Sequence, residues 1–140
     1  MSARFEAEPN VSNHFAWVRT RLALERTYLA WLRTAVSLIG FGFTIVQFFA
    51  RLQKMPALGG REMRPQEPRD LGLALIATGI GVLAISSWQY LSLQRYLWSD
   101  DFTPIAGKRG RRIHSPALFA GAILALIGIA AFASVFFHFL

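Results

Sequence analysis

Three long stretches without Asp, Glu, Lys or Arg limit what this 140-residue chain can fold into. They are Ala35–Ala50, Leu71–Leu91 and Pro116–Leu140. The second and third each hold about twenty or more residues, the length of helix that spans the hydrocarbon core of a bilayer. The first covers only about 24 Å at the helical rise, so its helix must borrow a turn from the preceding residues. A soluble bundle would have to bury three such helices, and a chain of this size lacks the polar shell to do so. The sequence therefore predicts an all-α integral membrane protein with three transmembrane helices.

The predicted elements form one membrane domain over residues 1–140, in which an N-terminal amphipathic helix continues into the first transmembrane helix. Their approximate ranges are 13–32 for the amphipathic helix, 33–51 for the first span, 52–70 for an external loop, 71–93 for the second span, 99–115 for a cytoplasmic loop and 116–139 for the third span. We expect an N-cap at Ser12 or Asn13, and Ser115-Pro116 is a typical start for the last helix. An amphipathic segment of this kind is expected to lie in the headgroup plane.

The 15 basic residues predict the orientation in the membrane. Five precede the first span and five lie between the second and third, which puts ten on one side against five in the first loop. The positive-inside rule then places the N-terminus in the cytoplasm and the C-terminus outside. For a bacterial protein this corresponds to a multi-pass protein of the inner membrane.

Residues 16–36 form a tandem repeat of three seven-residue units, each with alanine first, Arg-Thr in the middle and an aliphatic residue last. On a helix, seven residues fall about 20° short of two full turns. Arg19, Arg26 and Arg33 therefore form one nearly straight stripe, with about 10.5 Å between neighbours. Because the first span borrows residues before Ala35, Arg33 is expected near the edge of the membrane core.

Two interpretations of this stripe are open. On an interfacial helix, arginines reach anionic lipid headgroups, each contact being worth about 1 kcal/mol. Alternatively, the stripe faces a water-filled interior, where a ring of arginines from several copies would form an anion pathway. Three packed helices leave no lumen, so the pore interpretation requires an oligomer.

Other chemistry finds little support in the sequence. No nucleophile motif, phosphate-binding glycine loop or metal-ligand spacing occurs, and cysteine is absent. We therefore expect no enzyme activity, no metal and no cofactor. The basic run Lys108–Arg112 is more typical of a topology determinant than of a nucleic-acid site, because no recognition motif accompanies it. Small residues within the spans predict close helix packing; those expected to serve it are Gly40, Gly42, Gly79, Gly121 and Gly128.

The segment Leu22–Thr34 resembles a known family. It reads Leu-Ala-Leu-Glu-Arg-Thr-Tyr-Leu-Ala-Trp-Leu-Arg-Thr, similar to the motif Leu-Ala-x-Glu-Arg-Thr-x-Leu-Ala-Trp-x-Arg-Thr of the YidH-like small membrane proteins of bacteria. The same domain, of unknown function, forms the membrane part of the eukaryotic vacuolar transporter chaperone complex, a polyphosphate polymerase. Related domains there assemble as a pentamer around a polyphosphate pore lined by basic residues.

The resemblance implies a channel-like membrane domain without polymerase activity, since the soluble catalytic domain is absent. It implies that Arg19 and Arg26 occupy basic pore positions and that Arg33 matches an arginine of the bacterial members. Arg95 would correspond to a further pore arginine near the cytoplasmic end of the second span. Glu25, Thr27 and Trp31 are expected to support this site. Glu25 would shape the electric field at the arginines or pair across protomers.

The function expected from the sequence is a homo-oligomeric, arginine-lined pore or anion-binding vestibule, with a pentamer and phosphate or polyphosphate as the favoured assembly and cargo. The alternative is a non-conducting scaffold or accessory subunit that binds anionic lipid and partner helices. Nucleic acid is not an expected partner.

Overall fold

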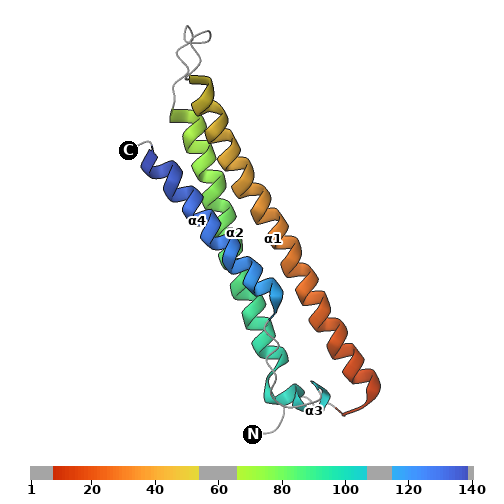
Figure 1. Ribbon diagram of the computed structural model, residues 1–140. Coiled ribbons are helices and arrows are strands. Elements are labelled where there is room, and N and C mark those ends of the chain that lie inside the picture. The colour runs from red at the N-terminus through yellow and green to blue at the C-terminus, as the bar shows by residue number, and fades with distance from the viewer. Residues whose placement is uncertain (1–7, 54–65, 107–114, 139–140) are drawn as a thin grey trace.

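The computed structural model describes residues 8–53, 66–106 and 115–138. The described part of the chain is helical and contains no strand, which confirms the predicted all-α class. Its elements are α1 (Val11–Gln53), α2 (Gln66–Leu97), the short 3-10 helix η2 (Asp100–Phe102), α3 (Thr103–Ala106) and α4 (Pro116–His138). The long helices α1 and α2 run antiparallel side by side, and α4 packs against both of them (Figure 1).

Helix α1 is one continuous helix of 43 residues, about 64 Å long at the helical rise. The predicted N-caps are wrong: Asn10 caps the helix, since its Oδ1 accepts a hydrogen bond from the backbone N–H of Asn13 at 2.7 Å. The amphipathic segment does continue into the first span, as predicted. It does not lie flat, because no bend separates it from the rest of α1 (Figure 1).

Part of the apolar surface of this N-terminal segment packs on protein. Trp17 is buried with Leu97 and Ile105 in a small second core. The Trp17 indole N–H donates to the carbonyl oxygen of Leu97 at 3.0 Å, and His14 Nδ1 lies 2.7 Å from the carbonyl oxygen of Ile105. The predicted cytoplasmic loop thus contains η2 and α3, which supply apolar side chains to this core. The basic run Lys108–Arg112 lies outside the described residues.

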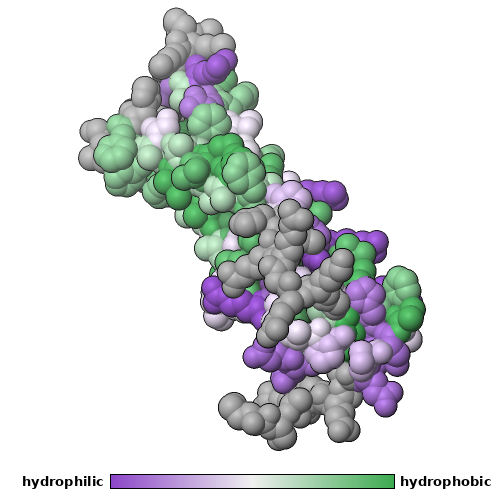
Figure 2. All heavy atoms as spheres, turned by 60° about the horizontal axis from the view of Figure 1, so that its bottom comes forward, coloured by the Kyte–Doolittle hydropathy of each residue, from purple (hydrophilic) through white to green (hydrophobic). Residues whose placement is uncertain are grey.

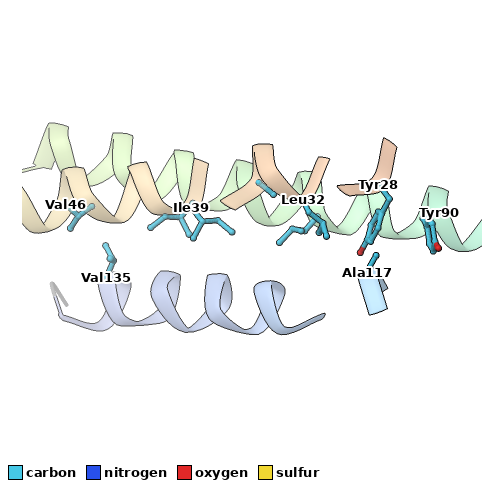
Figure 3. Packing of buried hydrophobic residues seen from close by; sticks show 10 residues of the cluster. Tyr28, Leu32, Ile39, Val46, Tyr90, Ala117 and Val135 are labelled. Atoms are coloured by element: carbon cyan, nitrogen blue, oxygen red, sulfur yellow. The ribbon is translucent and has the colours of Figure 1, made fainter. Parts of the chain in front are cut away.

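The main core lies where the three long helices meet (Figure 3). Its buried members are Tyr28, Leu32, Ala35, Ile39, Val46, Ile76, Leu83, Tyr90, Ala117 and Val135. Glycines bring the helix backbones together: a Cβ on Gly42 would lie 2.7 Å from the carbonyl oxygen of Gly72, and one on Gly128 would lie 2.9 Å from Cδ1 of Ile39. Close backbone approach at small residues is typical of membrane helix packing.

Three described helices are long and apolar enough to cross a membrane: Val11–Gln53, Pro68–Leu97 and Pro116–Phe137. Their outward surfaces are apolar, and Figure 2 shows an apolar band on one face of the molecule, with polar residues gathered toward the end at which α3 lies. On α4 the exposed Phe119, Leu126 and Phe137 share one side, opposite the buried Ala117. Such a surface suits lipid and would be unfavourable in water. Helix α2 begins at Gln66, inside the range predicted as an external loop, and residues 54–65 of that loop lie outside the described part.

Candidate anion-binding stripe

The stripe formed by Arg19, Arg26 and Arg33 lies on the exposed side of α1. All three side chains are exposed. Each arginine is two residues away from a buried residue: Trp17, Tyr28 and Ala35 respectively. Two residues correspond to about 200° around a helix at 3.6 residues per turn. The arginine stripe is therefore almost opposite the side by which α1 packs on α2 and α4.

Tyr28 fixes this rotational setting of α1. Its ring stacks on Tyr90 with centroids 4.7 Å apart, and its hydroxyl lies 3.0 Å from Oγ of Ser87. The same hydroxyl lies against Gly121 of α4, where a Cβ would collide with it. Turning the stripe inward would break all of these contacts at once, so the stripe is held outward by the packing of the chain itself.

The register between α1 and α4 shows how Arg33 lies relative to the apolar span of α4. Helix α4 begins beside Glu25 and passes Tyr28 at Gly121. Its charge-free span of 22 residues is about 33 Å long, which matches a hydrocarbon core of about 30 Å. Arg33 is five residues beyond Tyr28, about 7.5 Å further along α1. The backbone of Arg33 thus lies alongside the apolar span of α4.

Glu25 is engaged inside the chain. Its side chain is half-buried, and its Oε1 accepts a hydrogen bond from Oγ of Ser115 at 3.2 Å. Ser115 precedes the first residue of α4, Pro116, so a carboxylate stands at the N-terminal end of a long helix. This placement is favourable because the helix dipole carries partial positive charge at that end. Glu25 therefore ties α1 to the start of α4.

The other predicted site residues do not join the stripe within one chain. Arg95 is exposed and lies two residues before Leu97, which contacts Trp17. Arg95 of α2 and Arg19 of α1 thus lie at a similar level along the two helices. Each points away from the α1–α2 contact, on the outer side of its own helix. The Thr27 hydroxyl donates to the carbonyl oxygen of Ala23 at 3.0 Å, and Trp31 is exposed.

Four of the five predicted packing glycines lie in helix contacts and one does not. Gly42, Gly79, Gly121 and Gly128 lie in contacts between the described helices, whereas a Cβ on Gly40 would meet no atom within 4 Å. Gly40 is exposed on the side of α1 that carries the arginines.

The sequence did not point to Tyr28, Tyr90, Ser87 or Ser115 as residues that orient the stripe. One signal was present: Tyr28 follows the second Arg-Thr pair of the repeat, two residues after Arg26, so it had to lie on the other side of the helix. Its partners are 59 residues or more away in the chain, and no local pattern identifies them.

Three long apolar helices with a basic stripe on the outward face of the first define a multi-pass α-helical membrane protein. Residues 19–96, more than half of the chain, match the family model of a domain of unknown function, DUF202. The chain belongs to this family, in agreement with the YidH-like resemblance of its arginine motif. No significant match was found among curated proteins or solved structures.

Proposed function

We propose that several copies of this chain assemble in a bacterial inner membrane around a common axis, with Arg19, Arg26 and Arg33 facing a water-filled basic pore or vestibule. The anion is phosphate or polyphosphate, and the resemblance to the vacuolar complex favours five copies. The N-terminus is cytoplasmic and the C-terminus external. The proposal assigns no enzymatic activity to the chain.

The observation that carries this proposal is the position of Arg33 beside the apolar span of α4, together with its outward direction. A guanidinium stays protonated in proteins, and an arginine near the centre of a membrane helix costs about 2.5–3.5 kcal/mol on insertion scales. Arg33 lies alongside the apolar span of α4 and points away from α2 and α4. Arg33 lies nearer the end of the span, where the cost is lower; a water-filled axis between copies would reduce it further, and a single chain offers no such axis.

The chemistry of the stripe supports an anion as the ligand. Guanidinium groups bind phosphate oxygens through paired donors, and rings of basic side chains select anions. Steps of about 10.5 Å along the axis would let an extended polyanion contact successive rings.

Anion permeability of the full-length protein in vesicles tests the proposal. We expect the wild type to pass phosphate in preference to potassium, and Arg33→Gln to lower that preference. Arg21→Gln is the matched control: it removes the same charge from α1, but Arg21 is half-buried and its Cζ lies 5.9 Å from the Trp98 ring centroid. A wild type no more permeable than empty vesicles would contradict the pore, and equal effects of both variants would contradict the role of the stripe.

A second candidate, a non-conducting scaffold that binds anionic lipid, is favoured by two exposed tryptophans that lie at the level of the stripe. Trp31 and Trp88 are exposed, as expected for residues at the headgroup level. This candidate predicts that anionic lipid remains bound after purification, and that the Arg19→Gln, Arg26→Gln double variant loses it without any change in permeability.

A further inference from the structure

The outward side of α2 carries a row of residues that the arginine stripe does not involve. From Gly81 the row continues in steps of four and three residues, which keeps its members on one side of the helix. This outer row of α2 consists of Gly81, Ile85, Trp88, Ser92 and Arg95. Ile85 and Trp88 are 59% and 70% exposed, Arg95 is exposed, and Ser92 is half-buried.

The outer row points away from α1. Three buried residues of α2, Leu83, Tyr90 and Leu97, each come two positions after a member of the row, which is about 200° around the helix. Tyr90 stacks on Tyr28 of α1, and the carbonyl oxygen of Leu97 accepts the indole N–H of Trp17. The outer row is therefore almost opposite the side by which α2 packs on α1.

We propose that the outer row binds one anionic glycerophospholipid, with an acyl chain along Gly81 and Ile85 and the phosphate group at Ser92 and Arg95. The inference goes beyond the proposed function, because it concerns a different helix and holds whether or not the arginine stripe of α1 lines a pore. It also gives Arg95 a role separate from the pore position that the family resemblance implies.

The first argument is the order of chemical groups along the row. The stretch Leu71–Gln94 carries no charged residue, and as a helix it is about 36 Å long, enough to span a hydrocarbon core of about 30 Å. Arg95 is the first charged residue after it. Toward Arg95 the row changes from aliphatic to indole, hydroxyl and guanidinium, as the surroundings of a membrane helix change from acyl chains to headgroups.

The length of the row also matches a lipid molecule. The backbone from Gly81 to Arg95 covers about 21 Å at the helical rise. A bilayer with its headgroups is about 40–45 Å thick, so one leaflet has about the length of the row. A Cβ on Gly81 would meet no atom of the described chain within 4 Å, so the surface at the acyl end of the row is open.

The second argument is that the polar groups of the row lack partners among the described residues. The other serine and threonine hydroxyls of α2 are hydrogen-bonded within the chain; they belong to Thr78, Ser86 and Ser87. The Ser92 hydroxyl makes no hydrogen bond to a described residue, and Arg95 forms no ion pair with one. Phosphate oxygens accept hydrogen bonds from both kinds of donor, and most strongly from a guanidinium group.

The third argument selects among lipid headgroups. No Asp or Glu occurs from Leu71 to Ser99, so α2 offers no carboxylate beside the row to pair with an ammonium group. Phosphatidylglycerol presents a phosphate without an ammonium group, whereas phosphatidylethanolamine carries both. One arginine near a membrane surface favours anionic lipid by about fivefold. We therefore expect the row to prefer phosphatidylglycerol by about this factor.

The chain contains no cysteine, so a single thiol-linked fluorophore can report lipid contact at the row. Ile85→Cys places the fluorophore on the row. Leu126→Cys is the matched control, since Leu126 is 68% exposed on α4, a helix without Asp, Glu, Lys or Arg. Each full-length variant is reconstituted in vesicles of phosphatidylethanolamine and phosphatidylglycerol, in which one lipid at a time carries brominated acyl chains. Quenching against the mole fraction of brominated lipid gives the relative binding constant of the two lipids at each position.

We expect the fluorophore at Ile85 to report a preference of about fivefold for phosphatidylglycerol and the fluorophore at Leu126 to report none. Arg95→Gln should remove the preference at Ile85, and Arg95→Lys should retain most of it because the charge remains. Arg33→Gln should leave it unchanged, because Arg33 lies on the outward side of α1. Circular dichroism checks that the helical content of each variant is unchanged.

Three results would overturn the inference. Equal lipid preference at the two labelled positions would show that the row does not select a headgroup. Equal losses from Arg95→Gln and Arg33→Gln would show that the net charge of the protein, and not the row, attracts the lipid. A fluorophore at Ile85 that neither brominated lipid quenches would show that protein, such as a further copy of the chain, covers the row.

Discussion

Replacing Gly42 with alanine is expected to push α1 and α2 apart. The added Cβ would lie 2.7 Å from the carbonyl oxygen of Gly72 and 2.9 Å from Cγ1 of Ile76. The carbonyl belongs to a helix backbone and cannot rotate away. Since ordinary van der Waals contact begins near 3.4 Å, the helices must separate locally by about 0.7 Å, and the separation loosens contacts on both sides of the glycine.

The magnitude follows from two opposing effects. An extra carbon atom in a well-packed core costs about 1–3 kcal/mol, while alanine stabilises a helix over glycine by about 0.5–1 kcal/mol. Gly81→Ala is the matched control, since a Cβ there meets no atom of the described chain within 4 Å. Both variants carry the same helix gain, so their difference isolates the packing cost, about 1–3 kcal/mol.

Unfolding by sodium dodecyl sulfate in maltoside micelles measures this difference, with far-UV circular dichroism as the signal. We expect the Gly42→Ala midpoint to lie clearly below that of Gly81→Ala, and the latter to equal or exceed the wild type. If the two variants unfold at the same detergent fraction, the close α1–α2 approach at Gly42 does not exist in the membrane protein, and the helix register built on it is wrong.

Three further predictions use the same packing. Tyr28→Phe should lower the free energy of unfolding by about 0.5–1.5 kcal/mol by removing the hydrogen bond to Ser87; a double-mutant cycle with Ser87→Ala checks it, and additive effects would contradict the bond. Glu25→Gln should cost about 0.3–1 kcal/mol through the lost charge at the start of α4; the unfolding midpoint measures it, and no loss at low salt would show that the dipole contact contributes nothing. A phosphatase fused after Leu140 should be active and a fluorescent protein fused there dark, since the positive-inside rule puts this end outside; the opposite pair of signals would invert the topology.

The features that local chemistry determines could be predicted from the sequence. The three apolar stretches indicated the spans, Ser115-Pro116 marked the start of α4, and the seven-residue repeat put the arginines on one side of one helix. Each of these signals lies within a few residues of the structure that it specifies, so no knowledge of distant partners was needed.

What depends on partners far along the chain could not be predicted. Apolar residues at helical spacing do not say whether lipid or protein covers them, so the sequence does not reveal that Trp17 packs on Leu97 at the end of α2 and on Ile105 of α3. The level of Arg33 along α4 likewise follows from the register between α1 and α4. Contacts such as Tyr28 with Gly121 set that register, and these two residues are far apart in sequence.

Seven-residue spacing occurs on two sides of α1, in the arginine stripe and in the buried residues. The buried residues of α1 from Tyr28 onward are spaced by four and three residues; they are Tyr28, Leu32, Ala35, Ile39, Gly42 and Val46. The inner line is filled by α2 and α4, which shows that α1 already uses seven-residue spacing to pack on helices. Because Tyr28 fixes the rotation of α1, the arginine stripe points away from α4, whose own exposed side carries Phe119, Leu126 and Phe137. In the proposed assembly α1 therefore lies at the centre and α4 at the lipid boundary, an order that follows from the packing of a single chain.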